Sequence, residues 1–133
     1  MIFLTVSVLA LSFPGCGKKE NTSDRTLRVG IVTYTQDDPF INTMTEQIRE
    51  DLKLKESKDM KILVSVKNGD NDQRDQDELV EEMIAAGCDV LCVNLVDRTA
   101  PSDIIKAARQ EKIPVIFFNR EPVKEDLMQW DQL

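Results

Sequence analysis

The chain has 133 residues, with 24 acidic and 17 basic side chains and a net charge of −7. This length predicts one domain, and the acidic balance argues against nucleic acid as a partner, because a phosphate backbone needs a basic face. There is no histidine, which excludes serine and cysteine triads with an imidazole base and argues against catalytic zinc.

The amino-terminal residues 2–13 form an apolar run that is too short to span a bilayer as a helix but has the size of a signal-peptide core. Gly15 then precedes Cys16, and this arrangement resembles the lipobox of bacterial lipoproteins. The resemblance implies a signal peptide over residues 1–16, lipidation of Cys16, and a protein that is lipid-anchored on the extracytoplasmic face of the membrane, or periplasmic. The polar residues 17–26 are typical of a flexible tether.

The folded part is expected to begin with residues 27–34, a β-branched apolar run typical of a strand that is buried on both faces. Asp38 then stands at the N-cap position of a predicted helix, and Pro39 at its first position. Apolar residues recur every four along this helix, which reaches about residue 55, and they are Phe40, Met44, Ile48 and Leu52.

The alternation of strand and helix then continues along the chain. Residues 61–68 predict a second strand, and the helix after it is expected to end at Gly87. Residues 89–96 predict a third strand, Pro101 opens a third helix, and residues 114–119 predict a fourth strand. The apolar residues that mark the later helices are Leu79, Val80, Met83, Ile84, Ile104, Ile105, Ala108, Val123, Leu127 and Trp130.

Strands separated by helices predict an α/β fold, with a parallel sheet in three layers and the strand order 2-1-3-4. Such a sheet binds ligands beyond the carboxyl ends of its strands. Four loops meet at this edge, which we call the rim: residues 35–40, 68–72, 94–98 and 119–122. These loops are rich in aspartate and asparagine.

The rim loops lack the glycine-rich pattern of a phosphate cradle, which argues against a nucleotide ligand. Carboxylates and amides around one aromatic residue, Phe40, are typical of a site for a neutral polyhydroxylated ligand, because carboxylates accept hydrogen bonds from hydroxyls. From the residues alone, an aspartate such as Asp38 is more often only an N-cap, and an aromatic residue such as Phe40 more often only a core residue.

Four segments, VGIVTYTQDDPF, NGDNDQRDQ, CVNLVDRTAP and VIFFNREP, resemble the amino-terminal lobe of periplasmic galactose/glucose-binding proteins, the sugar receptors of bacterial ABC importers. The resemblance covers residues 27–133 and implies one lobe of two, truncated before its last strand, with the second lobe absent. It also implies that Asp38 accepts hydrogen bonds from sugar hydroxyls around carbon 4. Phe40 would stack on one face of the sugar ring, and Asn94 would bind further hydroxyls.

The same resemblance implies capture of galactose or glucose without catalysis, without a cofactor and without a metal. The implied partners are a hexose and the membrane subunits of an ABC importer, with a chemoreceptor as a further candidate and nucleic acid excluded.

Other rim residues have simpler interpretations. Asp37 is expected to be a solvated neighbour of Asp38, and Asp97 a turn or cap residue. Tyr34 is expected to support the first rim loop, and residues 119–121 to close the last rim loop by internal hydrogen bonds.

Two other classes of protein share this sheet. A phosphorylated receiver domain would use Asp37, Asp38 and Asp97 with Mg²⁺, but the fourth strand ends in FFNR rather than in serine or threonine. The ligand domain of a sugar-responsive repressor would carry a helix-turn-helix where this chain has its apolar leader.

Overall fold

The computed structural model describes residues 25–124. The predicted signal peptide with Cys16 and most of the tether lie outside the described residues, as do Leu127 and Trp130. Those predictions stay predictions.

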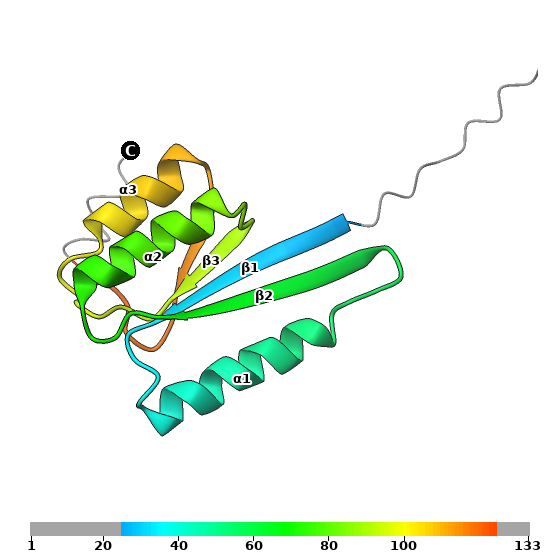
Figure 1. Cartoon of the computed structure of the whole chain (residues 1–133), viewed down its shortest axis with the longest axis horizontal. Helices are drawn as coiled ribbons and strands as arrows, with labels where there is room; N and C mark the ends of the chain where they lie inside the picture. The colour runs from blue at the N-terminus through cyan, green and yellow to red at the C-terminus, as the bar shows by residue number, and fades with distance from the viewer. Residues whose placement is uncertain (1–24, 125–133) are drawn as a thin grey trace, which may run out of the picture.

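Four parallel strands form one sheet in the order β2-β1-β3-β4, and helices cover both of its faces (Figure 1). The elements are β1 (Arg25–Thr33), α1 (Pro39–Lys53), β2 (Met60–Asn68), α2 (Gln73–Ala85), β3 (Val90–Val93), α3 (Ser102–Gln110) and β4 (Val115–Phe117). Helix α1 lies on one face, and α2 and α3 lie on the other (Figure 1). The predicted three-layer α/β fold and its strand order are confirmed.

The two sides of the central strand β1 build two separate cores. Val29 and Ile31 pack with Ile62 of β2 on the face that α1 covers. Val32 points to the other face, where it packs with Val80 of α2 and other residues beneath α2 and α3. Each aliphatic side chain buried in this way stabilises the fold by about 1.5–3 kcal/mol. This explains why β1 reads as a continuous apolar run rather than as an alternating one.

The start of α1 and the end of α2 follow the predicted capping chemistry. The Asp38 side chain accepts a hydrogen bond at the start of α1, and Pro39 occupies its first turn. At the end of α2, Gly87 adopts a φ of 79°, and the N–H of Cys88 donates to the carbonyl of Met83. This left-handed turn directs the chain into β3 and is favourable for glycine.

Most strand boundaries differ from the sequence prediction by one to three residues, including the start of β1 and the end of β3. β1 begins at Arg25, so residues 25–26, which the sequence assigns to the tether, pair with Met60 and Lys61 of β2. β3 ends at Val93 rather than at residue 96, because the N–H groups of Val96 and Asp97 donate to side chains of α2 instead of to a neighbouring strand.

The tight packing at Gly30 predicts that Gly30→Val destabilises the fold by about 1–3 kcal/mol. A Cβ at this position would lie 3.0 Å from both Leu91 and Met83 and 3.1 Å from Cys88, so a larger side chain would displace the core. Urea unfolding measures the loss of stability. Ser65 is the matched control, because it pairs with Gly30 across the sheet and is exposed. Ser65→Val should change the free energy of unfolding by less than about 0.5 kcal/mol, and equal effects at the two positions would contradict the packing argument.

Candidate functional site

The Asp38 carboxylate is fixed at the start of α1, directly after the first rim loop. Its Oδ1 accepts a hydrogen bond from the backbone N–H of Phe40 at 2.8 Å. Its Oδ2 accepts a hydrogen bond from the Tyr34 hydroxyl at 2.7 Å. The Tyr34 hydroxyl and then the Phe40 N–H hold the pKa of Asp38 below its usual value, because both bonds favour the charged carboxylate. Asp38 is therefore an ionised acceptor at neutral pH.

Phe40 lies in the first turn of α1 and is 59 % exposed. The core position of this turn belongs instead to the neighbouring Ile41, which is fully buried. The interpretation of Phe40 as a core residue is therefore wrong. The rim instead presents an aromatic ring to solvent two residues after a fixed carboxylate.

Asn94 is the first residue after β3 and is completely buried. Its Nδ2 donates to the Phe118 carbonyl and to the Oδ1 of Asn119, at 3.1 Å each, and its Oδ1 accepts from the N–H of Tyr34 at 3.4 Å. One amide therefore joins the ends of β1, β3 and β4 under the rim. It is not exposed beside Asp38 and Phe40, so its predicted contact with a sugar stays a prediction.

Two glutamines of α2, which the sequence analysis did not single out, hold the third rim loop. The completely buried Gln76 donates to the Asn94 carbonyl at 3.0 Å and accepts from the N–H of Val96 at 2.9 Å. Gln73 accepts from the N–H of Asp97 at 2.7 Å. A signal was present in the sequence, because Gln76 lies on the same helical face as Val80 and is a polar residue in an apolar stripe.

Of the remaining rim residues, Asp97 behaves as predicted, and residues 120–121 differ from the prediction. The Asp97 carboxylate accepts from the hydroxyl and the backbone N–H of Thr99, which lowers its pKa and makes it a turn residue. The Arg120 side chain donates to the Val96 carbonyl at 2.7 Å, and the Glu121 carbonyl accepts from the Arg98 side chain at 2.8 Å. These two bonds join the last rim loop to the third rim loop, and they are not the internal hydrogen bonds that the sequence predicted for residues 119–121.

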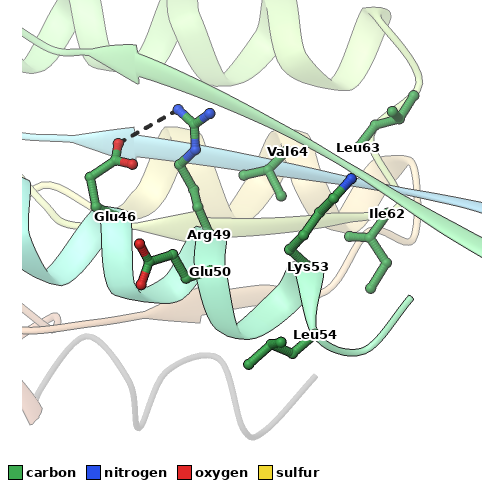
Figure 2. A pocket seen from close by; sticks show the side chains of 8 residues that line it. All are labelled: Glu46, Arg49, Glu50, Lys53, Leu54, Ile62, Leu63 and Val64. Atoms are coloured by element: carbon green, nitrogen blue, oxygen red, sulfur yellow. Dashed lines mark ion pairs between the residues drawn. The ribbon is translucent and has the colours of Figure 1, made fainter. Parts of the chain in front are cut away.

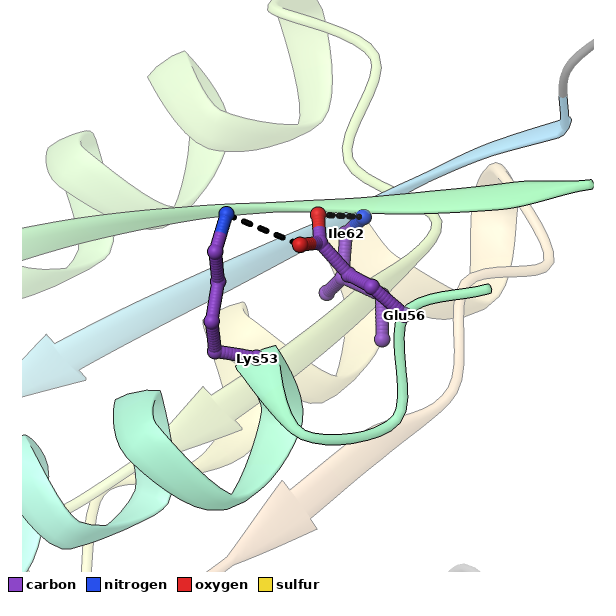
Figure 3. Close-up of polar contacts among 3 residues, drawn as sticks. All are labelled: Lys53, Glu56 and Ile62. Carbon is purple, nitrogen blue, oxygen red and sulfur yellow. Dashed lines mark hydrogen bonds and ion pairs between the residues drawn. The ribbon is translucent and has the colours of Figure 1, made fainter. Parts of the chain in front are cut away.

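A groove of about 600 Å³ lies between α1 and the edge strand β2 (Figure 2). Its lining residues are Glu46, Arg49, Glu50, Lys53, Leu54, Ile62, Leu63 and Val64, and none of them belongs to the rim. Glu56 contacts two of these lining residues: it forms an ion pair with Lys53 at 2.8 Å and accepts from the N–H of Ile62 at 2.9 Å (Figure 3). The Lys53 ammonium and then this N–H lower the pKa of Glu56. The Glu56 carboxylate thereby bonds one of the backbone N–H groups on the unpaired edge of β2, and this protects the edge from pairing with another strand.

Within residues 25–124, no cluster of three or more histidine, cysteine, aspartate or glutamate side chains is arranged to hold a metal ion. The helices of this same region also include none that is long and apolar enough to cross a bilayer.

Comparison with known families decides which class of protein this fold represents. The model of the periplasmic binding protein domain matches residues 29–130. The chain belongs to this family. The match favours a binding protein over the receiver and repressor alternatives.

Among characterised relatives, the D-galactose/methyl-galactoside binding periplasmic protein of Haemophilus influenzae is 31 % identical over 105 residues, which are 79 % of this chain and 30 % of that protein. The ribose import binding protein of Bacillus subtilis is 26 % identical over 125 residues, 90 % of this chain and 39 % of that protein. The chain therefore spans between about a third and two fifths of the length of these relatives.

A solved structure with the same fold is the ABC transporter periplasmic solute binding protein of Actinobacillus succinogenes with bound D-allose. It is 21 % identical, with a TM-score of 0.65, and the similarity covers 79 % of this chain and 36 % of that one. This likeness supports the fold.

The contacts of Asp38 predict a pH-dependent loss of stability in Asp38→Ala. Because folding lowers the pKa of Asp38, its stabilising contribution is fully present above the unfolded value of about 4 and is lost as the pH falls through the folded value. Urea midpoints at pH 7 should therefore be lower for the variant, and the difference should shrink as the pH falls through the folded pKa of Asp38. Asp37→Ala is the control, since Asp37 is an exposed neighbour whose backbone N–H forms the hydrogen bond to Thr35. A difference between wild type and Asp38→Ala that stays constant with pH would contradict the ionised cap.

The two hydrogen bonds of Gln76 predict that Gln76→Ala destabilises the protein by about 1–3 kcal/mol, because it leaves the Asn94 carbonyl and the Val96 N–H without their partner. Thermal unfolding followed by circular dichroism measures the effect. Glu78→Ala, on the exposed side of the same helix, should leave the transition nearly unchanged. A similar shift for both variants would mean that helix propensity, rather than the rim contact, causes the effect.

Proposed function

We propose that this chain forms the amino-terminal sugar-binding lobe of an extracytoplasmic solute-binding protein that delivers galactose or glucose to an ABC importer. The observation that carries the proposal is the ionised Asp38 carboxylate, which is fixed on the rim two residues before the exposed Phe40. Family membership and the ligands of the relatives, which include galactosides, ribose and D-allose, support the class of ligand.

Each group at the proposed site has a separate task. The Asp38 carboxylate accepts hydrogen bonds from the sugar hydroxyls around carbon 4, and Phe40 covers one apolar face of the pyranose ring. Asn94 supplies hydrogen bonds to further hydroxyls, which requires its amide to leave the Phe118 carbonyl or Asn119 when sugar binds. No bond of the sugar is broken, and the cycle consists of capture, closure and release.

The proposal includes a second lobe that covers the other face of the sugar, because sites for small ligands bury most of the ligand surface. It also includes the membrane subunits of the importer as partners, a chemoreceptor as a further candidate, and a lipid anchor on Cys16. A single lobe should bind hexose weakly, with a dissociation constant on the order of 1 mM, because one face of the ring stays in water.

The test is a titration of the isotopically labelled 133-residue chain with galactose and with glucose, followed by NMR chemical shifts of the backbone amides. Saturable shifts are expected at the first rim loop and the start of α1, and a linear polyol such as sorbitol should not produce them. Asp38→Asn keeps a capping side chain and should weaken binding about tenfold, and Phe40→Ala at least about threefold.

Asp37→Asn is the matched control and should bind like the wild type. Wild-type affinity in both Asp38→Asn and Phe40→Ala would contradict the site. Absence of saturable shifts at the rim with either sugar would contradict the function of the lobe. Submicromolar binding by this chain would contradict the need for a second lobe.

A further inference from the structure

Three hydrogen bonds hold Tyr34, which lies between β1 and the first rim loop. Its N–H donates to the Asn94 side chain at 3.4 Å, and its carbonyl accepts from the N–H of Asn71 at 2.8 Å. Its hydroxyl donates to Asp38 at 2.7 Å. These contacts fix the backbone on both sides of Tyr34, and its phenol donates to the Asp38 carboxylate.

Arg120 reaches the same phenol from the last rim loop. Its guanidinium carbon lies 4.5 Å from the centre of the Tyr34 ring, which is cation–π contact. The same guanidinium donates to the Val96 carbonyl at 2.7 Å, which holds it in place over the ring. The chain of contacts therefore runs from the third rim loop through Arg120 and Tyr34 to Asp38.

We infer that Tyr34 and Arg120 are positioning residues for the Asp38 carboxylate, and that they set the sugar affinity of the rim by acting through Asp38. This inference rests on the proposed function. The Tyr34 hydroxyl fixes the rotation of the carboxylate by occupying one position on Oδ2, while the Phe40 N–H occupies one on Oδ1. Because a carboxylate has about four acceptor positions, acceptor capacity remains on both oxygens for hydroxyls of the ligand.

The electrostatic surroundings of Tyr34 and Asp38 agree with this assignment. Asp37 precedes Asp38 in the same loop, Arg120 faces the Tyr34 ring, and Asp97 is bonded to Thr99. The hydrogen bond to Asp38 raises the pKa of Tyr34 and lowers that of Asp38, and Arg120 acts in the opposite direction on Tyr34. Loss of the Tyr34 hydroxyl should therefore raise the pKa of Asp38 and weaken its hold on a hydroxyl ligand.

The decisive variant is Tyr34→Phe, which keeps the ring beneath Arg120 and removes only the hydroxyl. In the 133-residue chain, the ¹³C resonance of the Asp38 carboxyl should titrate at a higher pH than in the wild type. The dissociation constant for galactose at pH 7 should rise about fivefold. The acidic limit of sugar binding should move to higher pH together with the carboxyl titration.

A second pair of variants tests Arg120. Arg120→Met keeps an apolar side chain over the ring but loses the cation and the bond to Val96, and it should also weaken galactose binding. Arg98→Met is the matched control, because Arg98 bonds the same loop at Glu121. Arg120→Lys, which keeps the charge, should restore part of the affinity.

The outcomes separate the inference from the proposed function. Wild-type Asp38 titration in Tyr34→Phe would overturn the role of Tyr34, whether or not the chain binds sugar. Equal losses in Arg98→Met and Arg120→Met would overturn the role of Arg120 in favour of simple ordering of the loop. Failure of the wild type to bind sugar would contradict the proposed function alone, and the carboxyl titration would still decide the positioning of Asp38. If Tyr34→Phe did not fold, Arg120→Met with the same two measurements would decide the inference.

Discussion

The shape of the rim depends on one constraint. Where a parallel strand leaves its sheet inside the protein, its backbone N–H and carbonyl groups still need hydrogen-bond partners. β3 ends at Val93, and the chain continues buried through Asn94 and Leu95 before it reaches the surface. The Asn94 N–H still donates to the Val32 carbonyl of β1, but Gln76, rather than a strand, bonds the Asn94 carbonyl and the Val96 N–H. An unpaired buried amide would cost about 1–3 kcal/mol. Gln76 of α2 therefore holds the third rim loop in one conformation.

The fold could be predicted from the sequence because its information is local and repeated. The β-branched runs, the Asp38-Pro39 start of α1 and the glycine that ends α2 each act within a few residues, and the alternation of strand and helix dictates a parallel sheet. The strand ends could not be predicted in the same way. Arg25 and Thr26 belong to β1 only because β2 extends to Met60 and offers them a partner. Strand ends depend on the neighbouring strand, which no local pattern contains.

The candidate site was predictable in part. Asp38 and Phe40 follow a strand directly, and the exposure of Phe40 follows from Ile41 taking the inward position of the first turn. The depth of Asn94 and the contact between Tyr34 and Arg120 join residues far apart in the sequence, so only the folded chain reveals them. Gln76 could have been identified as a polar residue on an apolar helical face, but the sequence alone does not show which buried groups it satisfies.

The two interpretations of Asp38, as a helix cap and as a sugar ligand, do not exclude each other. A cap needs one acceptor position, which the Phe40 N–H occupies on Oδ1. The Tyr34 hydroxyl occupies a second position on Oδ2, and each oxygen retains capacity to accept another hydrogen bond. The cap also places the carboxylate at the positive end of the α1 dipole, which favours its charged form. The contacts that make Asp38 a good cap therefore also make it a fixed, ionised acceptor, so its structural role prepares the binding role that we propose.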